Sequence, residues 1–272
     1  MLKTRVITAV VLLAILLAVV FADSFPLFVL VAALFSAAAF WENFRLFRNN
    51  RPALVAVLWV IVFVVIAFRG DAARIGALFG FCVAIWVIRL GPSLATGLPP
   101  LGGFANRLLG AVYGIAILGC FVAIAILFRH SPLYLLSTMA IVWIADIGAY
   151  FAGKSFGRHK LAPSISPGKS WEGAVGGWLA VLILAAASTL HPLLADSFAS
   201  RIHLKWGWAG LFATMSVLVV SSILGDLFES QLKRRAGLKD SSNLLPGHGG
   251  VLDRIDALIP VLPLAALIDL WL

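Results

Sequence analysis

Nine apolar stretches follow one another along this chain of 272 residues, and each approaches the length that crosses about 30 Å of hydrocarbon as a helix. They span residues 6–22, 26–44, 53–68, 75–90, 108–128, 133–152, 173–191, 207–228 and 257–272. The last is the weakest, because Pro260 and Pro263 interrupt it. Backbone groups inside a bilayer must be paired within the segment, which favours helices. The sequence therefore predicts an all-α, polytopic integral membrane protein with about nine transmembrane helices.

Composition supports the same class, since 62% of the residues are hydrophobic and only 12% are charged. Soluble domains are about 25% charged. The two longest polar stretches are 153–172 and 229–256. We therefore divide the chain into an N-terminal region of about five spans, 1–130, and a C-terminal region, 131–272, that carries both polar stretches.

The positive charges predict the orientation of the spans. With nine spans, one side of the membrane receives 16 of the 21 Lys and Arg residues, and the other side receives Arg69, Arg74, Arg129, Arg201 and Lys205. The positive-inside rule makes the richer side cytoplasmic. The N-terminus and both long polar stretches are then cytoplasmic, and the C-terminus lies outside. Cations in short loops between apolar stretches are the membrane pattern, so the net charge of +9 does not indicate a nucleic-acid partner.

Residues 1–22 allow a second interpretation, because Lys3 and Arg5 precede an apolar core that has Val20-Phe21-Ala22 near its end. A cleavable signal peptide and the first span of a polytopic protein look alike in this respect. Removal of this segment would leave the later topology unchanged.

Acidic residues at the end of the eighth stretch point to a functional site. Asp226 and Glu229 share a helix face, and Glu229 is spaced for an ion pair with Lys233, four residues on. Asp226 has no cation at helical spacing. A carboxylate near the membrane without such a partner favours a functional role.

A glycine turn follows, with His248, Gly249 and Gly250 just before Asp253 and Asp256. Glycines allow a tight turn whose amides can bind an anion. Two acids beside this turn, with a third on a neighbouring span, are typical of a magnesium site with few protein ligands. His248 is read either as a phosphate donor or as an ordinary loop residue.

The other polar stretch carries four cations between two acids: Lys154, Arg158, Lys160 and Lys169, flanked by Asp146 and Glu172. Any one of these cations can be explained as a cytoplasmic anchor of a span. Four together exceed what topology requires, so the group favours a surface that binds polyphosphate.

The run Ser230–Asp256 resembles the signature of the phosphatidate cytidylyltransferases (CDP-diacylglycerol synthases) at every fixed position: Ser-x-apolar-Lys-Arg, then Lys-Asp-x-small, then apolar-Pro-x-His-Gly-Gly-apolar-x-Asp-Arg-apolar-Asp. The segments 146–153, 160–173 and 225–230 and the opening Leu-Lys-Thr-Arg-Val-Ile-Thr are also similar to that family. Two positions depart from it. Ile147 replaces a frequent hydroxyl residue, and Lys154 replaces a common Arg, which keeps the charge but loses the bidentate fork.

The resemblance implies an enzyme of phospholipid biosynthesis in a bacterial inner (cytoplasmic) membrane. It would join CTP and phosphatidate to give CDP-diacylglycerol and pyrophosphate. Asp226 and Asp253 become the ligands of Mg²⁺, which a monovalent cation such as K⁺ can accompany, and a homodimer is implied. The expected catalytic residues are Asp226, Asp253, Asp256, Lys233 and Lys239. The expected substrate-binding residues are Asp146, Lys169, Arg234, His248, Gly249, Gly250 and Arg254.

Two other functions remain to be distinguished from this one. A CTP-dependent polyprenol or phytol kinase would transfer a phosphoryl group to a lipid alcohol, and would need a base beside the metal. A transporter would also explain many spans and acids near the membrane. Transporters often have repeated halves with broken helices at mid-membrane, whereas the acids here gather at one interface and no repeat is visible.

Overall fold

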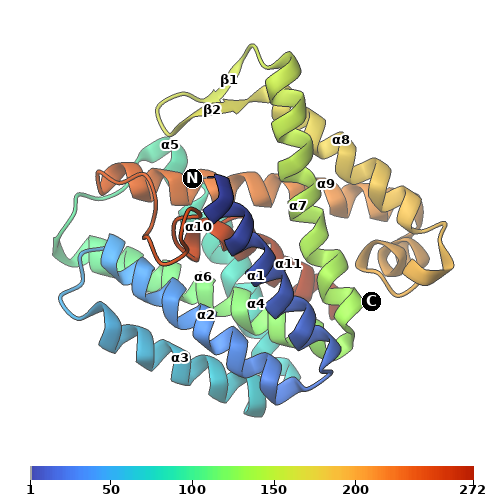
Figure 1. The fold of residues 1–272 in the computed structure, drawn as a ribbon, viewed down its shortest axis with the longest axis horizontal. Helices are drawn as coiled ribbons and strands as arrows, with labels where there is room; N and C mark the ends of the chain where they lie inside the picture. Colours follow the sequence, from blue (N-terminus) through green and yellow to red (C-terminus); the bar gives the residue numbers. More distant parts are fainter. Residues whose placement is uncertain (1) are drawn as a thin grey trace.

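The computed structural model describes residues 2–272 (Figure 1), without the side chains of residues 2–6, 9, 12 and 13. In chain order its elements are α1 (Leu2–Phe21), α2 (Phe25–Leu46), α3 (Pro52–Arg69), α4 (Ala72–Ile85), the π-helix η1 (Trp86–Leu90), α5 (Ser93–Thr96), α6 (Gly103–His130), α7 (Pro132–Phe156), β1 (Lys160–Ala162), β2 (Ser166–Ser170), α8 (Trp171–Ser188), the 3₁₀ helix η2 (Pro192–Leu194), α9 (Phe198–Arg235), α10 (Leu252–Ile255) and α11 (Leu258–Asp269). The predicted all-α class is confirmed.

Seven helical segments in the described part of the chain are long and apolar enough to cross a membrane, and they make it a multi-pass membrane protein: α2, α3, α4 continued to Thr96, α6, α7, α8 and α9. The predicted stretch 257–272 forms only α11, whose 12 residues extend about 18 Å. Pro263 lies inside it. The predicted stretch 6–22 lies in α1, whose side chains are only partly described. The count of about nine spans is therefore not confirmed.

Helix α6 is the centre of the bundle. In α6, 72% of the apolar window is buried, against 17% in α3. A helix that is hydrophobic on all sides is stable either inside a bundle or against lipid, so the buried fraction distinguishes α6 from α3. The short α11 packs against α4, α6 and α9. Helix α11 of the predicted C-terminal region, 131–272, thus packs against α4 and α6 of the predicted N-terminal region, 1–130. The division into these two regions stays a prediction.

Helix α9 is bent at Gly207, where φ is 65° and ψ is −167°. Such a positive φ suits glycine and interrupts the helix at the residue where the predicted stretch 207–228 begins. Beyond residue 228 the helix continues to Arg235. The first residues of the polar stretch 229–256 are therefore helical.

A short hairpin connects α7 to α8, and the sequence did not predict it. Strands β1 and β2 are antiparallel, with Lys160 opposite Ser170. The hairpin stands beyond the ends of α7 and α8 at the top of Figure 1. The Ser170 side chain accepts a hydrogen bond of 3.1 Å from the Gly173 amide and caps α8. Lys169 is thereby fixed one residue before this cap.

Loops from distant parts of the sequence meet at the two ends of the bundle. At one end, Arg235 donates a hydrogen bond of 3.0 Å to the Pro99 carbonyl, which joins the end of α9 to the connection before α6. At the other end, the Ser131 hydroxyl donates to Asp196 at 2.7 Å, which joins the α6–α7 turn to the segment before α9. The polar stretches 153–172 and 229–256, which carry most of the predicted site residues, lie at the first end.

Candidate active site

A cavity of about 410 Å³ lies between α7, α8, α9 and β2. Asp146 from α7, Lys169 from β2 and Asp226 from α9 all line it. Lys169 Nζ lies 2.5 Å from Asp226 Oδ2, and these side chains are 27% and 29% exposed. Most of the other lining residues are small or apolar, including Ala145 and Val219. This first cavity thus combines apolar walls with two carboxylates and two cations, since Lys154 also lines it. Asp146, Lys169 and Asp226 are predicted site residues.

A second cavity of about 660 Å³ is formed by the loop between α9 and α10. Lys239, predicted as catalytic, lines it together with His248, Gly249 and Arg254, which were predicted to bind substrate. Gly249 has a φ of 81°, which favours glycine. The Arg254 guanidinium donates two hydrogen bonds, of 3.1 and 2.7 Å, to the His248 carbonyl and braces the turn. The residues that line this cavity are mainly polar or glycine.

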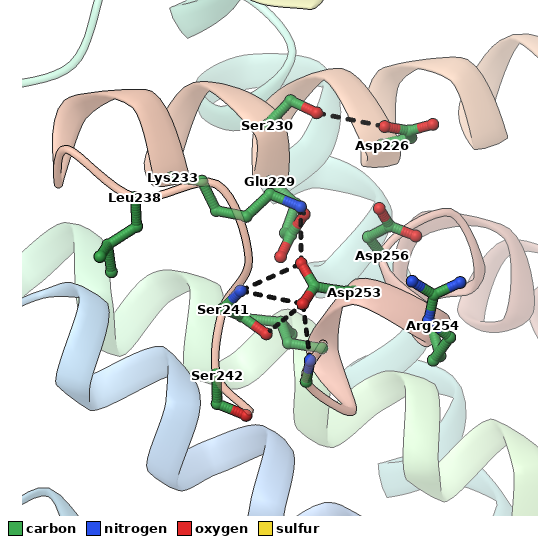
Figure 2. A network of polar contacts seen from close by, with 12 residues as sticks. Asp226, Glu229, Ser230, Lys233, Leu238, Ser241, Ser242, Asp253, Arg254 and Asp256 are labelled. Carbon is green, nitrogen blue, oxygen red and sulfur yellow. Dashed lines mark hydrogen bonds and ion pairs between the residues drawn. The ribbon is translucent and has the colours of Figure 1, made fainter. Parts of the chain in front are cut away.

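Lys233 joins the end of α9 to α10 (Figure 2). Its Nζ lies 2.6 Å from Asp253 Oδ1 and also forms an ion pair with Glu229. The three side chains are nearly or fully buried, with 12% of Lys233, 4% of Asp253 and none of Glu229 exposed. The predicted pair between Glu229 and Lys233 is confirmed. Lys233 also holds a second carboxylate, which the sequence did not reveal.

The carboxylate of Asp253 is fully engaged with donors. Besides Lys233, it accepts hydrogen bonds from the Ser241 amide at 2.9 Å, the Ser241 hydroxyl at 3.0 Å and the Gly250 amide at 2.7 Å. Burial raises the pKa of Asp253, but the hydrogen bonds from Lys233 and from these amides outweigh it and hold the pKa below the usual range. Asp253 is therefore an ionised group in a fixed orientation.

Asp256 lies near Asp226 in the same network, on the turn that follows α10 (Figure 2). Its Oδ1 accepts a hydrogen bond of 2.8 Å from the Ala257 amide. Burial and then the charge of Asp226 raise the pKa of Asp256 to about 8. The charge of Asp226 beside Asp256 favours a cation between the two carboxyl groups.

The donor set suits a hard divalent cation, because carboxylate oxygens are its usual ligands. Each predicted metal ligand already holds a cationic group: Asp226 holds Lys169 and Asp253 holds Lys233. No lysine contacts both of these acids, and no ready cluster of three or more potential metal ligands occurs among residues 2–272 with described side chains. The assignment of Asp226 and Asp253 to Mg²⁺ stays a prediction.

Two predicted substrate-binding residues, Arg234 and Gly250, line neither of the two cavities. Arg234 is exposed at the end of α9, where its Nη1 donates 3.3 Å to the Leu238 carbonyl, and it lines neither cavity. Gly250 also lines neither cavity, but its amide holds Asp253. A Cβ at Gly250 would collide with Ser241 Oγ and Glu42 Oε1, so this position has no room for a side chain.

Glu42, on α2, is the contact that sequence reasoning missed. It is fully buried and accepts hydrogen bonds from the loop that precedes α10. The signal in the sequence was a lone carboxylate within the apolar stretch 26–44. Such a residue usually faces the interior and has a function. Nothing in the sequence identified its partners, which lie about 200 residues away.

Comparison with known proteins places the chain among similar sequences. Residues 3–271 match the model of the cytidylyltransferase family. Similar curated proteins include one from Pseudomonas aeruginosa, 38% identical over 100% of this chain and 97% of its own length. Another is from Haemophilus influenzae, 35% identical over 97% and 96%, and a third is from Bacillus subtilis, 33% identical over 96% and 95%. All three are named phosphatidate cytidylyltransferase.

Proposed function

The chain belongs to the cytidylyltransferase family, and from that premise we propose that this nucleotidyltransferase transfers CMP from CTP to phosphatidate, giving CDP-diacylglycerol and pyrophosphate. The observation that carries the proposal is the pair of cavities at one end of the bundle. One has apolar walls with Asp146, Lys169 and Asp226, and suits a lipid with an anionic head. The other is a polar glycine turn with two cations, which suits a polyphosphate.

Both substrates are anions, so the protein must neutralise charge and hold the reacting groups in line. A phosphatidate oxygen attacks the α-phosphorus of CTP, the bond to the bridging oxygen breaks, and pyrophosphate leaves. The phosphatidate oxygen is already ionised near neutral pH, so a dedicated base is unnecessary. The cations available to the phosphates are Lys154 and Lys169 at the first cavity and Lys239 and Arg254 at the second. His248, which lines the second cavity, is assigned to donate a hydrogen bond to phosphate.

Mg²⁺ belongs to the proposal, with Asp226 and Asp253 as its ligands and Asp256 beside them, and a monovalent cation such as K⁺ is proposed for the same carboxylates. Bound there, Mg²⁺ would neutralise charge on the phosphate oxygens. In the chain itself, Lys169 and Lys233 occupy these carboxylates. Lys233 keeps Asp253 oriented from its buried position. Lys169 is partly exposed, so its ammonium group can leave Asp226 and pair with a phosphate instead.

The membrane setting of the site is also proposed in finer detail. The end of the bundle that carries both cavities is assigned to the cytoplasmic face of a bacterial inner membrane, because it receives most of the cations. The C-terminus then lies outside. A homodimer is proposed from the resemblance, and the mass of the detergent-solubilised protein tests it.

The decisive experiment uses purified protein with phosphatidate, CTP and Mg²⁺, and measures pyrophosphate, CDP and the lipid product. We expect pyrophosphate and CDP-diacylglycerol. Asp226→Asn should abolish both products, and Asp196→Asn, an acid at the opposite end of the bundle, should leave them unchanged. Release of CDP with a lipid phosphate would instead indicate a kinase, and full activity of Asp226→Asn would remove Asp226 from the metal site.

A further inference from the structure

Glu42 is a buried carboxylate that the proposed reaction does not use. It lies near the end of α2, with none of its surface exposed. Four donors reach it: Ser242 Oγ, Ser241 Oγ at 3.3 Å, the Val251 amide at 3.0 Å and the Leu252 amide at 2.6 Å. A carboxylate this deep is costly unless it is hydrogen-bonded, and here hydrogen-bond donors from a single loop surround it.

The donors come from both ends of one loop. Ser241 and Ser242 precede the glycine turn, and Val251 and Leu252 follow it. A single carboxylate therefore fastens the entry and the exit of the loop 241–252 to a transmembrane helix. Because this loop contains the turn that lines the second cavity, its fastening fixes the shape of that cavity.

Glu42 is also linked to Asp253, because the Ser241 hydroxyl contacts both carboxylates. The Ser241 hydroxyl lies within hydrogen-bonding distance of both Glu42 Oε2 and Asp253 Oδ2, at 3.3 and 3.0 Å. One turn further along α2, the Arg45 guanidinium donates to the Ser241 carbonyl. Arg45 thus holds the backbone of Ser241, and Glu42 holds its side chain. Ser241 in turn orients Asp253.

We propose that Glu42 is a positioning residue for nucleotidyl transfer, which acts by clamping the loop 241–252 so that the glycine turn and Asp253 keep one geometry. This inference rests on the proposed function. The predicted site residues all lie beyond residue 145. With Glu42, the N-terminal half of the chain also contributes to the site. Glu42 itself lines neither cavity and is not assigned a contact with substrate.

The test is Glu42→Gln, which keeps the shape of the side chain but replaces one acceptor oxygen by a donor. Hydrogen exchange of the full-length protein in detergent, without metal or nucleotide, is measured on peptides that cover 241–252. Loss of a hydrogen bond to a charged group should make Val251 and Leu252 exchange at least about tenfold faster. The rate of pyrophosphate release should fall at least about tenfold, with kcat rather than only the KM for CTP affected.

Asn43→Ala is the matched control. Asn43 is the next residue of α2, is equally buried, and donates to the Gly110 carbonyl of α6 rather than to the loop. This variant should lower the melting temperature while loop exchange and activity per folded molecule stay at wild-type values. A general loss of stability would affect both variants alike, whereas a positioning role separates them.

Two results would overturn the inference: wild-type exchange of the loop in Glu42→Gln, or a faster-exchanging loop with wild-type kcat and KM. If Glu42→Gln does not fold, Ser242→Ala removes one donor to the same carboxylate and is judged by the same two measurements. Failure of the proposed function has a different signature. The wild-type protein would then release no pyrophosphate, while the exchange measurement would still decide whether Glu42 clamps the loop.

Discussion

Lys233 offers a test of how the end of α9 is held to α10 in the site. Its ammonium group is the shared partner of Glu229 and Asp253, and the pair with Glu229 lies within α9. Replacement by Met keeps the length and apolar volume of the side chain but removes the charge. Glu229, with no exposed surface, then has no positive partner, since neither of its oxygens receives a hydrogen bond from any other described group. Asp253 keeps its donors from Ser241 and Gly250.

The size of the effect follows from burial. Removing one partner of a buried ion pair costs about 3–5 kcal/mol, because a charge is left without compensation. One kcal/mol corresponds to about 2–4 °C of melting temperature in a chain of roughly this size. We therefore expect Lys233→Met to melt about 6–20 °C below the wild-type protein in the same detergent. Arg234→Met, which removes an exposed cation from the next position, should change the melting temperature by no more than about 2 °C.

A second substitution separates stability from catalysis. Glu229→Gln in the Lys233→Met background removes the unpaired buried charge, so most of the lost melting temperature should return. Pyrophosphate release should stay low, because Asp253 still lacks the cation that orients it. The reasoning fails if Lys233→Met melts within about 2 °C of wild type, or if the double variant recovers neither stability nor activity relative to Lys233→Met alone. Recovery of both would make Lys233 a purely structural residue.

Two further predictions test other contacts. Gly250→Ala should strongly reduce pyrophosphate release, because its Cβ would collide with Ser241 Oγ and Glu42 Oε1; activity above half of wild type would contradict the close packing of the loop. Burial raises the pKa of Asp196, but the hydrogen bonds that it accepts from Ser131 and His130 outweigh burial and hold this pKa below the usual value. Asp196 therefore stabilises the fold above its unfolded pKa and loses this effect as pH falls through its folded pKa. Asp196→Asn should thus lower the melting temperature slightly at pH 7, and this difference should vanish once the pH falls below the folded pKa of Asp196. A difference that persists in strong acid would refute this.

The sequence predicted contacts that arise within one helix and missed those that need the folded chain. Glu229 and Lys233 lie four residues apart, so helical spacing alone pairs them. Lys169 and Asp226 were both expected in the site but from separate stretches, and their ion pair depends on the packing of β2 against α9. Local spacing contains no information about such a contact.

The missed secondary structure has a similar physical cause. The β1–β2 hairpin has strands of 3 and 5 residues, and β2 contains Pro167 and Gly168, both depleted in strands. No alternating apolar pattern marks it, because it lies outside the helical bundle rather than against a core. Pro260 and Pro263 made the predicted ninth span the weakest, and α11 is indeed short.

Glu42 shows which sequence signal deserves more weight in a membrane protein. A cluster of charges attracts attention, and the cluster 229–256 did contain most of the predicted site residues. An isolated acid in an apolar span is stronger evidence for a specific partner, because a bilayer offers it neither water nor counterions. The charge must then be matched inside the protein. Its partner is a set of hydrogen-bond donors that would otherwise stay unpaired. In this fold the donors are amides and hydroxyls of the loop 241–252, so the lone acid of α2 and the glycine turn are two halves of one structure.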